Sequence, residues 1–181
     1  VTLLGALVWL ISASRLFADL LMANKVYSQQ RSIHSSNAEK VFEKGLRLIR
    51  QDNLENALTQ MEKIANSKLK TDLKDDAIFY AGWISWCLGN KGRFRTYFQR
   101  LAYYYPESEW GDDALFFLAE SDFEAGNYAR ASLEYSTLIS RFPYSENLHD
   151  AEYGLGQSRF AQNRFLQAIE SFERFIGDFG E

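Results

Sequence analysis

The chain has 181 residues, of which 46% are hydrophobic and 15% aromatic, enough apolar material for a packed core, which argues against disorder. A net charge of -4 leaves no excess of basic residues to neutralise phosphates, so we expect no nucleic-acid partner. Two prolines and recurrent apolar spacings of three and four residues predict an all-α fold, and the single cysteine, Cys87, permits neither an intrachain disulfide nor a multi-cysteine metal site.

Residues 1–23 are predicted to be a secretory signal or a membrane anchor, through which the protein would associate with a membrane. They begin with a near-apolar run that is shorter than the roughly 20 residues of a spanning helix, has small residues after it and lacks a positive start. The alternative is a degenerate copy of the repeat that follows, because Phe17 and Leu20 lie 37 residues before equivalent positions of the first repeat. Residues 24–36 are expected to be a linker.

From residue 37 onward a repeat of 37 residues organises the sequence without gaps. In the second half of each repeat a mostly small residue is followed four positions later by a large one, which is the spacing of one helix face. The two series are Ala57, Phe94, Ala131 and Ala168, and Met61, Phe98, Tyr135 and Phe172. Upstream, small residues recur at Gly45, Gly82, Ala119 and Gly156. They predict a first helix that approaches the second closely.

Residues that end or cap helices recur between these predicted helices. Residue types that tolerate a left-handed backbone end each first helix, at Asp52, Gly89, Gly126 and Asn163. Asn53, Asn90 and Asn127 follow as candidate helix caps, and the Pro-x-Ser closures at 106–108 and 143–145 stop the second helices. Helix hairpins are therefore expected at about 37–68, 75–105, 109–142 and 146–179. The four repeats span about 37–73, 74–108, 109–145 and 146–181, and the pattern predicts that they continue beyond residue 181.

The pattern resembles tetratricopeptide repeats over residues 37–181. It is clearest in Leu118, Ala119, Tyr128, Ala131, Tyr135 and Pro143, and in Leu155, Gly156, Phe165, Ala168 and Phe172. Repeat two departs from it at Lys91 and Phe94, and repeat one lacks the closing proline. The resemblance implies a right-handed superhelix of antiparallel helix hairpins.

The repeat length and the aromatic-Pro-x-Ser closure resemble a bacterial envelope branch of these proteins. That branch includes the TolA-binding cell-division coordinator and the lipoprotein of the outer-membrane barrel-assembly machinery. The resemblance implies a place in the periplasm or cell envelope, with the cytoplasm as the alternative.

In such superhelices the first helices line a concave groove, and the resemblance implies which positions face into it. The predicted partner-binding groove consists of Trp83, Trp86, Phe79, Phe116, Glu120, Phe123, Tyr153 and Phe160. Aromatic residues dominate binding hot spots, but aromatic stripes at helical spacing also pack between repeats, and for Phe42, Phe79, Phe116 and Tyr153 packing is the favoured interpretation. Asp76, Glu120 and Glu124 either select a basic partner segment or form a solvated acidic face.

Nothing in the sequence predicts a catalytic residue, a metal site or a cofactor. His34 and His149 stand in no metal-ligand spacing, and Gly154 and Gly156 lack the third glycine of a dinucleotide-binding loop. Cys87 is expected to be a small buried hydrophobic residue.

Three hypotheses for function follow. The first is a non-enzymatic scaffold that binds protein or peptide partners in the groove, with a role in outer-membrane assembly or in coordinating the envelope and cell division. The second is a structural oligomerisation module, and the sequence leaves the oligomeric state open. The third is a helical accessory domain of a larger enzyme such as a lytic transglycosylase, because an apolar last helix needs a cover.

Overall fold

A computed structural model describes residues 37–68, 71–105 and 107–177. In these ranges the chain forms only helices: α2 (Asn37–Arg50), α3 (Leu54–Ala65), α4 (Lys74–Cys87), α5 (Lys91–Tyr104), α6 (Gly111–Glu124), α7 (Tyr128–Arg141), α8 (Leu148–Ala161) and α9 (Phe165–Gly177). The predicted all-α repeat fold is confirmed. The predicted signal or anchor and the linker, residues 1–36, lie outside the described residues. Among the described helices, none is long and apolar enough to cross a membrane.

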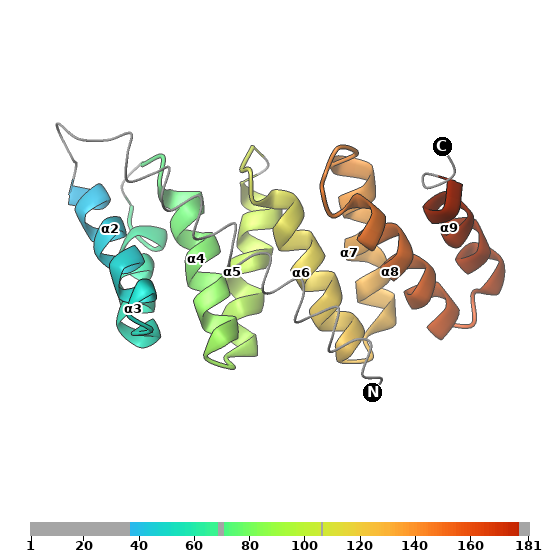
Figure 1. Ribbon diagram of the computed structural model, residues 1–181, viewed down its shortest axis with the longest axis horizontal. Coiled ribbons are helices and arrows are strands. Elements are labelled where there is room, and N and C mark those ends of the chain that lie inside the picture. Colours follow the sequence, from blue (N-terminus) through green and yellow to red (C-terminus); the bar gives the residue numbers. More distant parts are fainter. Residues whose placement is uncertain (1–36, 69–70, 106, 178–181) are drawn as a thin grey trace.

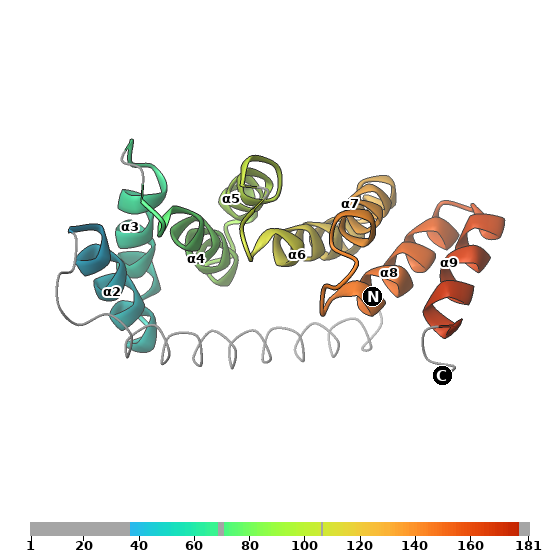
Figure 2. The same cartoon turned by 90° about the horizontal axis from the view of Figure 1, so that it is seen from above.

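The helices stand in a row in chain order, and each packs mainly against its neighbours in sequence (Figure 1). The hairpins are α2–α3, α4–α5, α6–α7 and α8–α9. Seen from above, the first helices α4, α6 and α8 lie on one side of the row, and the second helices α5 and α7 lie on the other (Figure 2). Contact between α5 and α6, where repeat two meets repeat three, is less extensive than at the other junctions.

The predicted left-handed residues occur at the hairpin turns. Backbone φ is 56° at Asp52, 71° at Gly89, 77° at Gly126 and 60° at Asn163, all of them in the region that ends a helix. Because these four residues share one repeat position, every hairpin turns in the same way.

The predicted asparagine caps are correct only for Asn90, whose Oδ1 accepts a hydrogen bond from the Arg93 backbone N–H at 3.1 Å. Asn53 makes no side-chain cap and instead accepts from Asn56, while the Asn127 amide donates to the Asp122 carboxylate. In both cases a side-chain partner within five residues competes with the helix end for the asparagine side chain.

Helices α6 and α8 begin two residues later than predicted, at Gly111 and Leu148. The Ser108 and Ser145 hydroxyls accept hydrogen bonds from the backbone N–H groups of Trp110 and Asn147, at 3.3 and 3.0 Å. Each closing serine therefore shapes the turn before the helix rather than capping the helix itself.

Close approach within each hairpin depends on the predicted small residues. A Cβ atom added to Gly45 would lie 2.6 Å from Met61 Cε, and one added to Gly156 would lie 2.5 Å from a carbon of the Phe172 ring. The small residue on the first helix thus accommodates the large residue sixteen positions later on the second, as the repeat predicted.

The outward face of α2 is polar. Exposed Lys40, Glu43 and Lys44 lie at the repeat positions that Ala77, Tyr80 and Ala81 occupy in α4, where these are at most 4% exposed beneath the preceding repeat. A polar outer face is what a terminal repeat needs, so α2 is suited to cap its end of the row.

Candidate partner-binding surface

Two residues of the predicted groove lie in the core and cannot contact a partner. Phe79 is 0% exposed and Phe116 is 4% exposed. Phe42, at the same repeat position, is 2% exposed. The Trp110 ring at the start of α6 stacks on Phe79, with 4.1 Å between ring centroids and an interplanar angle of 18°. The next repeat covers this ring, so the packing interpretation applies to Phe79 and Phe116.

The other aromatic residues of the predicted groove are partly or largely exposed. Trp83 and Trp86 on α4 and Phe123 on α6 are half-buried, whereas Tyr153 and Phe160 on α8 are 45% and 59% exposed. Three of these rings rest on the second helix of their own hairpin: Trp86 on Phe94, Phe123 on Tyr128 and Phe160 on Phe165, with centroids 4.8 to 5.3 Å apart. Each ring is held on one side and leaves part of its surface to solvent.

Helix α6 carries two acidic residues, Glu120 and Glu124, in addition to Phe123. Tyr135 donates a short hydrogen bond through its hydroxyl to Glu120 Oε1. Burial raises the pKa of the Glu120 carboxyl, the bond from Tyr135 opposes that shift, and the charges of Glu124 and Asp150 raise the pKa further. These carboxyl groups from α6 and α8 are therefore close enough to interact. Desolvation also raises the pKa of Glu124, and the charge of Lys91 acts against it.

Asp76, for which the sequence indicated either selection of a basic partner or a solvated acidic face, joins two repeats. The Trp110 indole N–H donates to Asp76 Oδ1 at 2.8 Å. At the same position of the next repeat, Asp113 Oδ1 accepts from Asn147 Nδ2 at 2.9 Å. The donor lies 34 residues after the acceptor in both cases, so an acid on one first helix binds the residue preceding the next.

A buried ionic cluster at the α5–α6 junction was missed by sequence reasoning. Arg95 Nη2 lies 2.5 Å from Asp122 Oδ1, and Arg95 Nη1 lies 3.7 Å from Glu134 Oε1. Asp122 and Glu134 are 1% and 5% exposed. Burial and the neighbouring Asp122 carboxyl together raise the pKa of Glu134 to about 8, against the opposing charge of Arg95. One signal was present: Arg95 stands at the repeat position of Leu58, which packs in the core.

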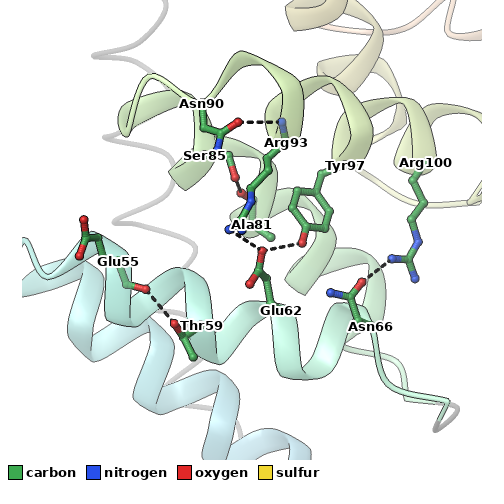
Figure 3. Close-up of polar contacts among 10 residues, drawn as sticks. All are labelled: Glu55, Thr59, Glu62, Asn66, Ala81, Ser85, Asn90, Arg93, Tyr97 and Arg100. Carbon is green, nitrogen blue, oxygen red and sulfur yellow. Dashed lines mark hydrogen bonds and ion pairs between the residues drawn. The ribbon is translucent and has the colours of Figure 1, made fainter.

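Repeats one and two are joined by polar contacts between their second helices (Figure 3). Glu62 Oε1 on α3 accepts from Arg93 Nη1 at 3.1 Å and from the Tyr97 hydroxyl at 2.9 Å. Arg100 donates to Asn66 Oδ1 at 3.1 Å and to the Ala65 carbonyl at 2.6 Å, near the carboxyl end of α3, where a cation is favoured. These contacts fix the stacking of the two repeats on the side away from the first helices.

Cys87 was expected to be buried, but it is exposed at the end of α4. Desolvation of its thiol by neighbouring atoms still raises the pKa to about 11, so the group is a neutral thiol near pH 7. Within the described part of the chain, no group of three or more His, Cys, Asp or Glu side chains is arranged to hold a metal ion.

The sequence and the fold were compared with those of known proteins. Residues 150–181 match the tetratricopeptide repeat, and none of the curated proteins matches the sequence. The fold is similar to that in two crystal structures of MamA. The first is 16% identical, with a TM-score of 0.60 over 92% of this chain and 86% of that one. The second is also 16% identical, with a TM-score of 0.61 over 91% of each chain.

The chain has a tetratricopeptide-like fold. In this tetratricopeptide-like row, the half-exposed rings of α4 and α6 and the neighbouring carboxyl groups all belong to first helices. The more specific resemblance to envelope proteins stays a prediction.

Proposed function

We propose that the protein is a non-enzymatic scaffold that binds a segment of a partner protein along its first helices. The observation that carries the proposal is the set of half-exposed rings, Trp83, Trp86 and Phe123. Trp86 and Phe123 rest on rings of the second helix of their hairpins, and Glu120 and Glu124 lie on the same helix as Phe123. Rigid aromatic side chains bury much area at a small entropic cost and are enriched among binding hot spots. The tetratricopeptide-like fold supports this role.

The chemistry of this surface favours a partner segment with apolar and basic side chains. The Glu120 carboxyl group interacts with those of Glu124 on α6 and Asp150 on α8. A lysine or arginine of the partner would offset that repulsion, while its apolar neighbours cover the rings. Binding is expected to weaken with added salt, since Glu124 and Asp150 are exposed.

Photo-crosslinking from chosen positions in the native cell tests this proposal. A benzoylphenylalanine at position 86 is expected to give a discrete adduct, which mass spectrometry identifies. The same probe at position 104 is expected to give none, because Tyr104 is 78% exposed on the second helix α5. Trp83→Ala with a crosslinker at position 123, and Glu124→Lys in the same background, should each weaken the adduct. Equal crosslinking from positions 86 and 104 would contradict the assignment.

An extracytoplasmic location is also proposed, on the basis of the near-apolar start of the sequence followed by small residues. Fusing alkaline phosphatase, which is active only after export, to residue 36 tests it. Activity is expected from the natural sequence and not from a version with two arginines inserted into the apolar run. A fusion that is inactive in both versions would place the protein in the cytoplasm.

A further inference from the structure

The three junctions between repeats differ at the same three side-chain positions. One position lies on the second helix of a repeat, and the other two lie on the first and second helices of the next repeat. From the first junction to the last, the side chains are Leu58, Ser85 and Tyr97, then Arg95, Asp122 and Glu134, then Ser132, Arg159 and Ser171. Carboxyl groups occur only in the middle set, where repeat two meets repeat three.

Neutral or singly charged contacts fill these positions at the outer two junctions. Leu58 packs in the core at 6% exposure, and the Ser85 hydroxyl donates to the Ala81 carbonyl at 2.7 Å. Arg159 Nη1 donates to the Ser171 hydroxyl oxygen at 2.7 Å. Because neither set holds a carboxyl group, these two junctions gain no carboxylate charge at these positions as the pH rises.

The middle junction buries two acids beside one arginine. Arg95 binds one oxygen of each carboxyl group, and the other oxygens, Asp122 Oδ2 and Glu134 Oε2, are buried without a hydrogen-bond partner among the described residues. Two ionised carboxylates can only accept hydrogen bonds, so neither can bind the other. A single proton allows one carboxyl group to donate to the other and makes the total charge of the three side chains zero. We call Arg95, Asp122 and Glu134 the junction latch.

Glu134 is the member of the junction latch that changes charge near neutral pH. Burial and the Asp122 charge raise its pKa to about 8, and a hydrogen bond with Asp122 adds to the rise, while Arg95 and Arg130 oppose it. The charged and titratable groups that face Glu134 come from three helices: Arg95 and Tyr103 from α5, Asp122 from α6, and Arg130 and Tyr135 from α7. Burial raises the pKa of both tyrosine hydroxyls above their usual value of 10, so both stay neutral up to pH 9.

Two other contacts of this junction lie at the opposite end of α6 from the latch. Just before α6 starts, Trp110 donates to Asp76, and nearby Arg141 Nη1 at the end of α7 donates to the Ala102 carbonyl near the end of α5 at 2.9 Å. The latch lies where α6 ends, beside the first halves of α5 and α7. The α5–α6 contact, in the middle of the row, is also less extensive than the α3–α4 and α7–α8 contacts (Figure 1). The start of α6 is therefore suited to act as a pivot, and the latch closes the other end.

We propose that the junction latch is a proton-controlled hinge, closed while Asp122 and Glu134 share a proton and open once that proton passes to solvent. In the open state the unbalanced carboxylate draws water into the junction, and repeats three and four rotate away from repeats one and two about the start of α6. Trp86 on α4 and Phe123 on α6 lie on opposite sides of the hinge, so opening changes their separation. That consequence for partner binding rests on the proposed function, whereas the hinge itself does not.

Pulsed electron paramagnetic resonance between two nitroxide labels on the full chain measures the opening, with Cys87→Ser so that only introduced cysteines react. Thr59, Thr96 and Leu133 share one repeat position and are exposed in the first halves of α3, α5 and α7. Labels at 96 and 133 span the latch, and labels at 59 and 96 are the matched control across the first junction. A rotation of about 15° about one end of α6 moves its other end, about 20 Å away, by about 5 Å. From pH 6 to pH 9 the distance between labels 96 and 133 should therefore lengthen by about 5 Å, while that between labels 59 and 96 stays constant.

Two substitutions should keep the hinge closed at both pH values. Glu134→Gln cannot ionise, and its amide can still donate to Asp122. Asp122→Asn leaves an ionised Glu134 that balances Arg95, so no charge is left over. Circular dichroism checks that both variants are folded.

A distance between labels 96 and 133 that does not change with pH, while Asp122 and Glu134 are both present, overturns the proposal. So does equal lengthening in Glu134→Gln, because the proton of Glu134 would then not be the cause. Equal lengthening between labels 59 and 96 also overturns it, because the whole row would then loosen rather than this junction. The chain is measured without a partner, so failure here is distinct from failure of the scaffold function.

Discussion

Gly154 shows how a single side chain joins two repeats. The Tyr135 ring of α7 lies so close to it that an added Cβ would be 2.5 Å from ring carbon Cζ. Tyr135 is 0% exposed, and its hydroxyl is bound to Glu120, so the ring has little room to move away. A glycine inside α8 is thus kept at the expense of helix propensity, because packing of α7 on α8 requires it.

Gly154→Ala is expected to lower the free energy of unfolding by about 2 kcal/mol, because overpacking outweighs the better helix propensity of alanine. Urea denaturation followed by circular dichroism measures it. Gly92→Ala in α5 is the matched control, since the nearest atom to an added Cβ there is Asn90 Oδ1 at 3.8 Å. Stability should be unchanged or slightly higher in that variant. Equal destabilisation by both changes would show that the Tyr135 contact is unimportant.

Trp110 combines a hydrogen bond and a ring stack that separate substitutions can resolve. Trp110→Phe keeps an aromatic ring over Phe79 and removes the N–H that binds Asp76, so a loss of about 1 kcal/mol in unfolding free energy is expected. Trp110→Ala also removes the ring and should cost about 3 kcal/mol or more. Thermal denaturation of both variants gives the comparison. If Trp110→Phe and Trp110→Ala were equally unstable, the hydrogen bond rather than the stack would join these repeats.

At the scale of elements, the sequence predicted the helices and their turns, because both follow from local spacing. The left-handed conformation of Asp52 and Asn163 was predicted from their residue type and their shared repeat position. Contacts between repeats could not be predicted from local spacing or residue type. Burial of Phe79 depends on Trp110, and the Asp76 carboxylate is bound by a residue 34 positions later. A repeat pattern shows which positions are equivalent but not which neighbour covers them.

Arg95, Asp122 and Glu134 come from α5, α6 and α7 and meet at the least extensive helix junction. Two of their carboxylate oxygens, Asp122 Oδ2 and Glu134 Oε2, are buried without a hydrogen-bond partner among the described residues. Two buried carboxylates beside one guanidinium group would leave an uncompensated negative charge. Holding a proton on Glu134 removes that charge, which agrees with the raised pKa of Glu134.

Stability of this junction should therefore depend on pH through Glu134. The pKa is about 8 in the folded chain and near 4.5 when exposed, so the folded state binds the extra proton between these values. The contribution of Glu134 to unfolding free energy is fully present below pH 4.5, falls as pH rises, and is lost above about pH 8. The steepest slope is about 1.4 kcal/mol per pH unit.

Glu134→Gln cannot ionise and isolates this effect from other titrating groups. Relative to that variant, the natural protein should lose stability as the pH rises from 5 to 8.5, as measured by urea denaturation at each pH. Arg95, Asp122 and Arg130 remain in both proteins, so their charges cancel in the comparison. A difference that does not change with pH would mean that Glu134 is ionised throughout.

For the whole molecule, the row of repeats implies a graded stability, because each helix packs mainly against its neighbours in sequence. Helices α4 to α7 are flanked on both sides, whereas α2 and α9 have one extensive contact each among the described helices. The two ends also differ from one another. Helix α2 buries Phe42, Leu46 and Ile49, whereas α9 buries only Ala168 and Ser171.

Native-state hydrogen exchange is expected to follow that order, with α9 the least protected, α2 intermediate and α4 to α7 the most protected. Amides of α9 should exchange at least tenfold faster than those of α6, because opening α9 exposes the least apolar area. Equal protection of α9 and α6 would contradict this order and show that α9 is held by more than its contact with α8.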